Sequence, residues 1–237
     1  MVERIAKERL NIILLVDASQ SMQGKRIKQV NQAILDIKDY LKELQVENTN
    51  VDFFITIIPF ATEASFYKDT KYINIDNFDY EGIKIGGYSN LHLGYELLGD
   101  ILKKESKGGI MPDFGGVAPI ILLLTDGHPT GKMYKEYLER ISTSPWFKAA
   151  LRYGIAIELD DEKTLKVLND FVGGNGEVVS CYNANMLQRI IKIIVLTASK
   201  VKSSASKVVS VEHVTTKDQE IIQEIGEKLA DIESWEW

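Results

Sequence analysis

The sequence predicts an α/β fold in which an open, mostly parallel sheet carries helices on both faces, as in Rossmann-like proteins. Short apolar runs without polar alternation recur along the chain, and such runs are typical of strands buried on both faces. Stretches with apolar residues three and four positions apart separate them and favour amphipathic helices. Because strands that alternate with helices pair in parallel through right-handed crossovers, the order of the elements indicates this architecture.

The expected strands are rich in aliphatic and aromatic residues, and they are Asn11–Val16, Val51–Ile58, Val117–Leu124, Leu151–Ile157 and Glu177–Ser180. The third is the most apolar segment of the chain and the expected central strand. Pro59 is expected to end the second strand, because proline donates no ladder hydrogen bond. Ser65–Lys68 is expected to form a short edge strand, and residues 69–90 to be irregular.

The expected helices share an apolar face and are Lys25–Leu44, Leu91–Lys104, Met133–Arg140, Asp161–Phe171 and Ala184–Ala198. Residues 107–116 hold four glycines and a proline, and this composition predicts a surface loop. Together these elements predict one α/β domain over residues 1–200. After Ala198 the chain becomes rich in serine, and we expect residues 201–237 to form a linker and a tail. That tail contains a predicted helix at Asp218–Ile232, followed by Trp235 and Trp237.

Composition restricts the class of protein. The 237 residues are 45% hydrophobic and 26% charged, as in soluble globular proteins, and the net charge of −6 argues against a nucleic-acid partner. Cys181 is the single cysteine, so the chain has no internal disulfide. The first residues lack the apolar core of a signal peptide, and no apolar run approaches the roughly 20 residues that span a bilayer. These features lead us to expect a cytoplasmic protein with no membrane span.

Acidic and hydroxyl side chains gather where three segments meet the expected carboxyl edge of the sheet. Asp17, Ser19 and Ser21 follow the first strand, Ser89 precedes a helix, and Asp126 follows the Val117–Leu124 strand. Ligands bind at this edge of open α/β sheets. Two adjacent carboxylates repel each other unless a cation or a proton lies between them. This all-oxygen set is suited to a hard divalent ion, Mg²⁺ first, with Mn²⁺ or Ca²⁺ also compatible.

The three segments together resemble the von Willebrand factor A (VWA) family over roughly residues 9–200. The matching features are D-x-S-x-S after an apolar strand, a serine flanked by Gly86-Gly87 and Asn90-Leu91, and an apolar strand that ends in T-D-G. The resemblance implies a metal-ion-dependent adhesion site in which Asp17, Ser19, Ser21, Ser89 and Asp126 hold the metal. In that family the hydroxyls usually bind the metal directly, and one or both aspartates act through water.

Two positions depart from the family pattern, and neither removes a ligand. Gln20 stands where the bacterial pattern usually has glycine, and Ser89 stands where threonine is usual. Within the family, the segment LLLTDGHPTG and the serine-rich stretch after the last helix resemble bacterial tellurium-resistance TerY-like proteins. That resemblance implies a stress-response or defence setting, with a kinase or phosphatase of the same gene set as a partner.

The favoured function is a non-enzymatic adaptor in which an Asp or Glu of a partner protein completes the coordination of the metal. The expected rim of this site consists of Gln20, Tyr88, Asn90, Gly127 and His128. For Tyr88, packing on the sheet edge is an equal alternative, and for His128 a role as an ordinary loop residue is the simpler interpretation. Gly86, Gly87 and Gly127 are expected to satisfy the backbone of tight turns.

Two other interpretations of the chain stay open at this point. One is a haloacid-dehalogenase-like, Mg²⁺-dependent phosphohydrolase with Asp17 as nucleophile. Such enzymes need a general acid two residues further on, and the sequence has Ser19 there. The other is a scaffold without a metal, whose active element is the 218–232 helix with its two tryptophans.

Overall fold

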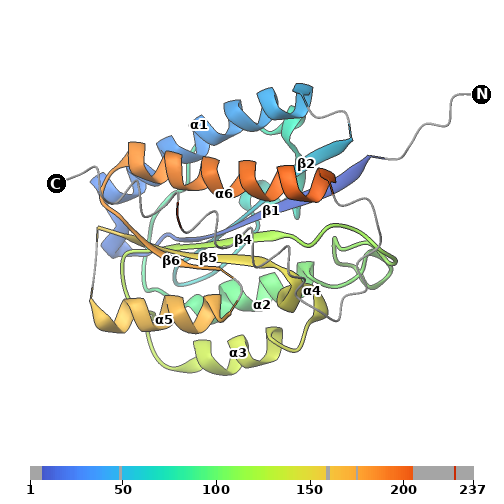
Figure 1. Cartoon of the computed structure of the whole chain (residues 1–237). Coiled ribbons are helices and arrows are strands. Elements are labelled where there is room, and N and C mark those ends of the chain that lie inside the picture. Colours follow the sequence, from blue (N-terminus) through green and yellow to red (C-terminus); the bar gives the residue numbers. More distant parts are fainter. Residues whose placement is uncertain (1–6, 48–49, 159–160, 175, 205–226, 228–237) are drawn as a thin grey trace, which may run out of the picture.

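A six-stranded sheet lies between two layers of helices (Figure 1). The computed structural model describes residues 7–47, 50–158, 161–174, 176–204 and 227. The sheet has the order β3-β2-β1-β4-β5-β6, with every neighbouring pair parallel except β2 and β3. The strands are β1 (Glu8–Asp17), β2 (Val51–Phe60), β3 (Ile73–Asn74), β4 (Ile120–Thr125), β5 (Leu151–Ile157) and β6 (Val178–Cys181). This confirms the α/β fold expected from the sequence.

The helices divide between the two faces of the sheet (Figure 1). The α-helices are α1 (Lys25–Glu47), α2 (Leu91–Ile101), α3 (Met133–Ile141), α4 (Pro145–Ala149), α5 (Glu162–Val172) and α6 (Ala184–Ser204). Helices α1 and α6 lie side by side over one face, and the other four cover the opposite face. Successive residues of β1 enter different cores, Leu14 on the α1 side and Leu15 on the α2 side. Burial on both faces is why this strand has no polar alternation.

The structure corrects four details of the predicted elements. Strand β2 continues through Pro59 to Phe60. The backbone polar groups of Pro59 point away from β1, so its missing N–H removes no hydrogen bond between β1 and β2. The antiparallel edge strand is β3, whereas residues 65–68 form no strand. Helix α2 ends at Ile101, three residues before the predicted end. Helix α4 was not predicted, although Ser144 caps it and Pro145 occupies its first turn.

Helix α6 continues to Ser204, past the predicted domain boundary at residue 200. The helix expected at Asp218–Ile232 and the two C-terminal tryptophans lie outside the described residues, apart from residue 227. The division into a domain and a tail therefore stays a prediction.

Candidate metal centre

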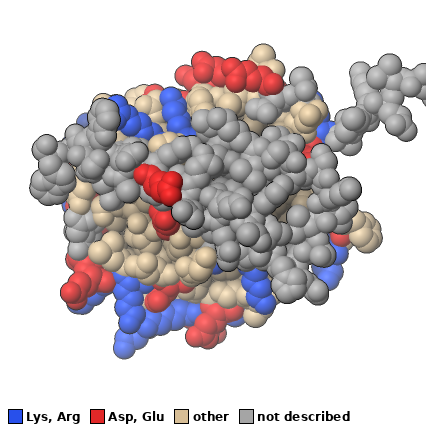
Figure 2. Space-filling model, viewed as in Figure 1, with Lys and Arg blue, Asp and Glu red and all other residues tan. Residues whose placement is uncertain are grey.

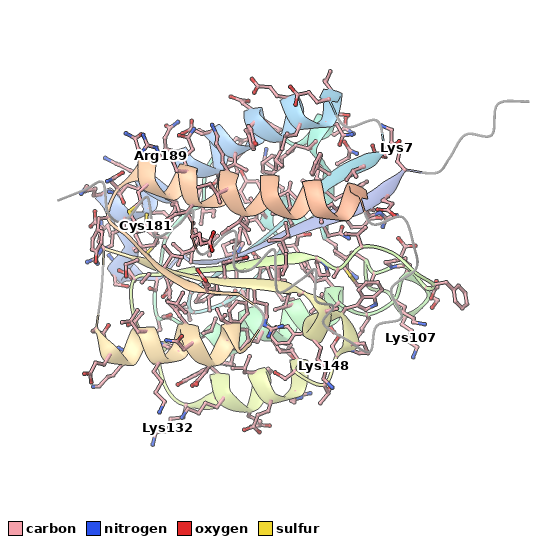
Figure 3. The ribbon with its side chains drawn as sticks, viewed as in Figure 1. Lys7, Lys107, Lys132, Lys148, Cys181 and Arg189 are labelled. Carbon is pink, nitrogen blue, oxygen red and sulfur yellow. The ribbon has the colours of Figure 1, made fainter. Side chains whose placement is uncertain are left out.

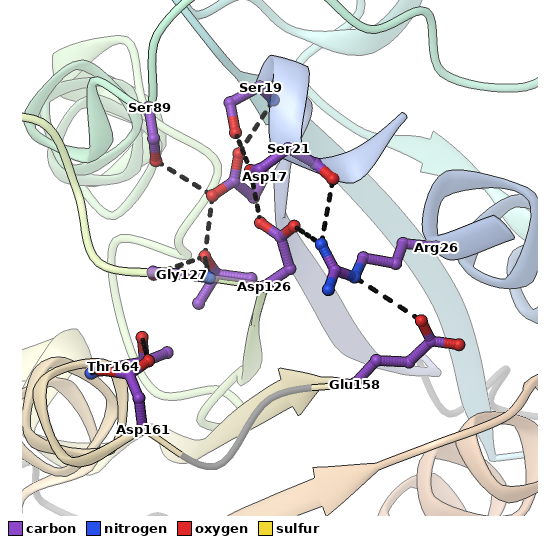
Figure 4. Close-up of polar contacts among 11 residues, drawn as sticks. Asp17, Ser19, Ser21, Arg26, Ser89, Asp126, Gly127, Glu158, Asp161 and Thr164 are labelled. Carbon is purple, nitrogen blue, oxygen red and sulfur yellow. Dashed lines mark hydrogen bonds and ion pairs between the residues drawn. The ribbon is translucent and has the colours of Figure 1, made fainter. Parts of the chain in front are cut away.

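The two predicted metal-binding aspartates lie at the carboxyl ends of neighbouring parallel strands. Val16 of β1 pairs with Leu124 of β4, so Asp17 and Thr125 end the two strands side by side, and Asp126 follows. Figure 4 shows these side chains converging with the three predicted serines. The structure thus brings together all five residues that the sequence pattern assigns to one site.

Asp17 is a buried carboxylate held by neutral donors. The backbone N–H of Ser19 donates to its Oδ1 at 2.9 Å, and the hydroxyls of Ser89 and Thr125 donate to its Oδ2 at 2.9 and 2.7 Å. Burial raises the pKa of this carboxyl, and the hydrogen bonds from Ser19, Thr125 and Ser89 act in the opposite direction. A negative charge in this position is therefore costly until a cation approaches.

Asp126 is also buried, but a charged side chain contacts it. Ser21 donates its hydroxyl proton to Oδ1 at 2.7 Å, and Nη1 of Arg26 lies 2.8 Å from Oδ2. The hydroxyls of Ser19 and Ser21 lie 3.0 Å apart. Because Ser21 has given its one proton to Asp126, Ser19 is the donor in this pair.

The arrangement of protons determines what the site can bind. The hydroxyl protons of Ser21 and Ser89 point at carboxylates, and that of Ser19 points at Ser21. The remaining hydroxyl lone pairs are free to accept, and Ser21 is exposed at the surface. Neutral and anionic oxygens without free donors are the ligand set that a hard divalent cation prefers. The residues present therefore fit the predicted metal.

No carboxylate-rich cage offers an alternative site. Among the described ranges, no group of three or more His, Cys, Asp or Glu side chains is placed to hold a metal ion. A metal at the candidate centre, which has two carboxylates, would therefore take further ligands from neutral oxygens such as the serine hydroxyls.

Backbone hydrogen bonds fix the loops that carry these ligands. Gln20 N–H donates to the carbonyl of Gly87 at 3.0 Å, and Thr130 N–H donates to the carbonyl of Ser89 at 2.8 Å. Gly87 has a φ of +79°, and a Cβ on it would lie 1.8 Å from Thr62 Oγ1. Glycine is therefore required at this position. Gly86 and Gly127 have no positive φ and open space around them, so the expected turn requirement holds at Gly87 only.

The loop that carries Gln20 forms without the family glycine. Gln20 begins a short 3-10 helix, Gln20–Met22, and is not among the described non-glycine residues with positive φ. Its side chain is exposed and donates to the Oε1 of Gln23. The substitution therefore costs the backbone no strain at this turn.

Of the other predicted rim residues, the structure places two, Gly127 and His128, at a hollow beside the candidate centre. Tyr88 is 67% exposed, so the alternative that it packs on the sheet edge is wrong. Asn90 donates from Nδ2 to the carbonyl of Thr62 at 2.9 Å, which turns this side chain toward the loop after β2. Gly127 and His128 line a hollow of about 720 Å³ that also includes Ser21, Arg26 and Asp126. This hollow reaches the metal centre and is completed by Asp161, Glu162 and Lys163.

Three side chains of the site were not predicted: Thr125, Arg26 and Glu158. Thr125 lies beside Asp126 in the T-D-G motif, and its hydroxyl donates to Asp17 and accepts from the backbone N–H of Gly127. Glu158 follows β5 and lies 3.6 Å from Nε of Arg26 and 2.7 Å from Lys25. Pairing with Lys25 and Gln29 lowers the pKa of Glu158. Arg26 lies on α1 shortly after the D-x-S-x-S motif but belongs to no motif, and Glu158 follows β5, so the fold rather than a sequence pattern brings them to the site.

The geometry of Asp17 gives no support to the hydrolase interpretation. The side chain is 1% exposed, and both of its oxygens already accept hydrogen bonds. A nucleophilic carboxylate needs an oxygen that reaches the substrate.

Cys181 is buried at the end of β6 beneath α6, as expected for a structural cysteine (Figure 3).

Charges of both signs are mixed on the surface that Figure 2 shows, where the described lysines and arginines alternate with acidic residues. No helix within the described part of the chain is long and apolar enough to cross a membrane.

Comparison with known proteins gives a consistent family match. The family model of the von Willebrand factor type A domain matches residues 11–192. Inter-alpha-trypsin inhibitor heavy chain H4 of Bos taurus is 30% identical over 126 residues, which cover 51% of this chain and 13% of that protein. Heavy chain H1 of Sus scrofa is 28% identical over 133 residues, which cover 54% of this chain and 14% of that protein. The chain therefore spans about an eighth of the length of these curated relatives.

Solved structures share the fold at low identity. Proximal thread matrix protein 1 of the mussel byssus superposes with a TM-score of 0.53 at 18% identity, over 82% of this chain and 49% of that one. A second structure of it, described with a zinc-occupied MIDAS motif, gives a TM-score of 0.51 at 17% identity, over 82% of this chain and 48% of that one. The pilus adhesin SpaC of Lactobacillus rhamnosus GG gives 0.53 at 13% identity, over 81% and 30%. At these identities the likeness concerns the fold.

Proposed function

We propose a metal-dependent protein-binding function for this chain from the premise that it belongs to the von Willebrand factor type A domain family. Domains of this family are usually non-catalytic binding modules, and their metal-ion-dependent adhesion site (MIDAS) commonly binds a divalent metal. The observation that carries the proposal is the inward direction of the hydroxyl protons in the candidate metal centre. Ser21 and Ser89 donate to the two aspartates, so their lone pairs are left for a cation.

Asp17, Ser19, Ser21, Ser89 and Asp126 would hold the metal, which we propose to be Mg²⁺, with Mn²⁺ or Ca²⁺ as substitutes. A bound divalent ion supplies an open coordination position that an Asp or Glu of a partner can fill. The chain's own residues orient the two carboxylates through Ser19, Thr125 and Arg26. The exposed Tyr88 and His128 supply contacts beside that position.

The charges at this edge support an acidic partner. The two candidate ligands Asp17 and Asp126 carry two negative charges, and Arg26 pairs with Asp126, which leaves one net negative charge among these three residues. A divalent ion reverses this sum to one net positive charge. A single carboxylate from a partner then restores neutrality, and complementary charge favours its approach over that of a basic side chain.

The cellular setting is a finer part of the proposal and rests on sequence resemblance. The TerY-like features predict a cytoplasmic adaptor in a bacterial stress-response or tellurium-resistance-like system. A kinase or phosphatase of the same gene set is the proposed partner. The relatives named above are different proteins, and nothing in their names bears on this setting.

Isothermal titration calorimetry of the full chain with MgCl₂ tests metal binding. The wild type is expected to bind one ion, and Asp17→Ala to lose at least about 100-fold in affinity, because a ligand and a charge are removed together. Asp39→Asn is the matched control, since Asp39 is an exposed carboxylate on α1. Failure of the wild type to bind Mg²⁺, Mn²⁺ or Ca²⁺ would remove the proposed function.

Partner binding needs a second measurement. Proteins captured from native lysate in Mg²⁺ are identified, purified and titrated against the chain with and without chelator. The proposal expects a partner whose binding is lost in chelator, in the Asp17→Ala variant, and when one acidic residue of the partner is replaced. Equal binding in all conditions would contradict a metal bridge.

A further inference from the structure

Arg26 is the charged side chain closest to the candidate metal ligands. It lies in the first turn of α1, and its side chain is 30% exposed, whereas the side chain of Asp126 is fully buried. Nη1 lies 2.8 Å from Asp126 Oδ2 and 3.1 Å from the carbonyl oxygen of Ser21. Figure 4 shows the guanidinium of Arg26 pointing at Asp126, with Glu158 on its other side.

The contact has an electrostatic reason. A buried carboxylate without a counter-charge is strongly unfavourable. The groups that donate to Asp17 are all neutral. Among the ion pairs of the described residues, the one that reaches Asp126 is that with Arg26. The guanidinium therefore supplies the positive charge that the pair of aspartates needs.

Arg26 also has a second carboxylate within reach. Its Nε lies 3.6 Å from Oε2 of Glu158, which is beyond a hydrogen bond but close enough for attraction. Glu158 is anchored by Lys25 at 2.7 Å and by Gln29 at 2.9 Å. It also has a φ of +51°, a conformation that few non-glycine residues adopt. The backbone at the end of β5 thus holds an acid on the far side of the guanidinium from Asp126.

We propose that Arg26 is a resident cation of the site that competes with the divalent metal. Without metal it neutralises Asp126, and when the metal binds it moves from Asp126 to Glu158. This inference rests on the proposed function and adds its regulation. Binding of the ion has to break the Arg26–Asp126 pair, and this cost lowers the affinity for the ion. It also explains how two buried acids remain compatible with a folded metal-free chain.

The test compares Mg²⁺ affinity by calorimetry, and thermal stability in chelator, for the full-length wild type and variants. Arg26→Gln is expected to bind Mg²⁺ about tenfold more tightly, because a competing positive charge is gone. The same variant should melt at a lower temperature in chelator and regain stability when Mg²⁺ is added. Arg140→Gln is the control, because it removes the same charge from an exposed position on α3.

A double-mutant cycle tests the part played by Glu158. Glu158→Gln should weaken Mg²⁺ binding in the wild-type background, because Arg26 then has no second carboxylate with which to pair when it leaves Asp126. The effect should shrink in the Arg26→Gln background. An equal effect of Glu158→Gln in both backgrounds would overturn the proposed movement. Arg26→Lys provides a further variant should Arg26→Gln fail to fold in chelator. Lysine has a single nitrogen, whereas the guanidinium reaches Asp126 through Nη1 and Glu158 through Nε, so the lysine variant should compete less and bind Mg²⁺ more tightly than the wild type.

The outcomes separate this inference from the proposed function. Tight Mg²⁺ binding by the wild type with no gain in Arg26→Gln and Arg26→Lys overturns the inference alone. Binding by Arg26→Gln but not by the wild type removes the proposed function and with it the movement to Glu158, which needs a wild type that binds the metal. No Mg²⁺ binding by any of these proteins overturns both.

Discussion

Buried charged side chains lie at both the amino and the carboxyl ends of the parallel strands, and the surroundings stabilise these charges in different ways. At the amino end of β5, Arg152 is 7% exposed and donates to carbonyl oxygens of Phe171 and Val172, at the end of α5. It also donates to Phe147 and Ala150 near the end of α4. Burial lowers the pKa of this guanidinium to about 10. The negative ends of two helices take the place of a carboxylate there.

At the carboxyl edge, the buried charges are carboxylates, and their donors include hydroxyls and a side chain with an alternative partner. Asp17 is held by neutral donors, whereas Asp126 is held by Arg26, which Glu158 also attracts. Fixed backbone dipoles suit a permanent structural charge. Side chains that can change partners suit a buried carboxylate whose counter-charge a bound cation will replace. The comparison teaches that the nature of the partner, rather than burial itself, separates a structural cluster from a binding site.

The largest expected effect comes from removing the structural cation. Arg152→Ala should lower the free energy of unfolding by about 3–5 kcal/mol, because it leaves a cavity and buried carbonyls without donors. The affinity for Mg²⁺ should stay unchanged. Chemical denaturation followed by tryptophan fluorescence measures the loss, and Arg140→Ala on the exposed face of α3 is the control. A loss below about 1 kcal/mol would show that water can replace the guanidinium.

A smaller loss of stability is expected from a substitution at Gly87, in the loop that carries Ser89. Gly87→Ala should cost about 2 kcal/mol, because alanine at a φ of +79° is strained and its Cβ would overlap Thr62 Oγ1. Mg²⁺ affinity should fall as well, since the loop carries Ser89. Gly86→Ala is the adjacent control, with open space and no positive φ, and should change stability by less than about 0.5 kcal/mol. Adding Thr62→Ala to Gly87→Ala should recover the part due to the overlap, and no recovery would assign the whole cost to φ.

The smallest effect separates a structural carboxylate from the binding carboxylates at the same edge. Asp161 caps α5 by accepting from the N–H groups of Lys163 and Thr164. Asp161→Ala should cost about 1 kcal/mol, whereas Asp161→Asn, which keeps the cap, should cost little. Neither should alter Mg²⁺ affinity. An affinity change in Asp161→Asn equal to that of Asp17→Ala would place Asp161 in the site instead.

The pH dependence of the cap has a definite sign. The hydrogen bond from Thr164 is the main cause that lowers the pKa of Asp161 below its ordinary value of 3.8. The extra stability from the ionised cap is therefore complete above that value and is lost as the pH falls through the lower folded-state pKa. Denaturation of the wild type and Asp161→Asn at several pH values checks this. The difference between them should disappear in acid, and a difference that grows in acid would contradict the assignment.

Sequence patterns predicted the sheet, its helices and the five residues of the candidate centre, because each depends on local periodicity or a compact motif. Strand β3 escaped prediction since two residues carry too little pattern. Pro59 was misjudged because its tolerance depends on which side of β2 is paired. Arg26 resembled any polar residue on a helix, and its contact with Asp126 depends on where α1 begins relative to β4. The cap signal Ser144-Pro145 was present before α4, yet the five-residue helix carries no periodicity.

The backbone bonds that join the loops of the metal centre have a mechanical consequence. Asn90 N–H donates to Ala61 at the end of β2, Gln20 to the loop that carries Ser89, and Thr130 to Ser89 itself. A pulling force on a partner held at this edge would enter β1, β2 and β4 together. Because these three strands are parallel and would be pulled in the same direction, the force would not slide them past one another. The loops of the candidate centre would therefore keep their spacing under load.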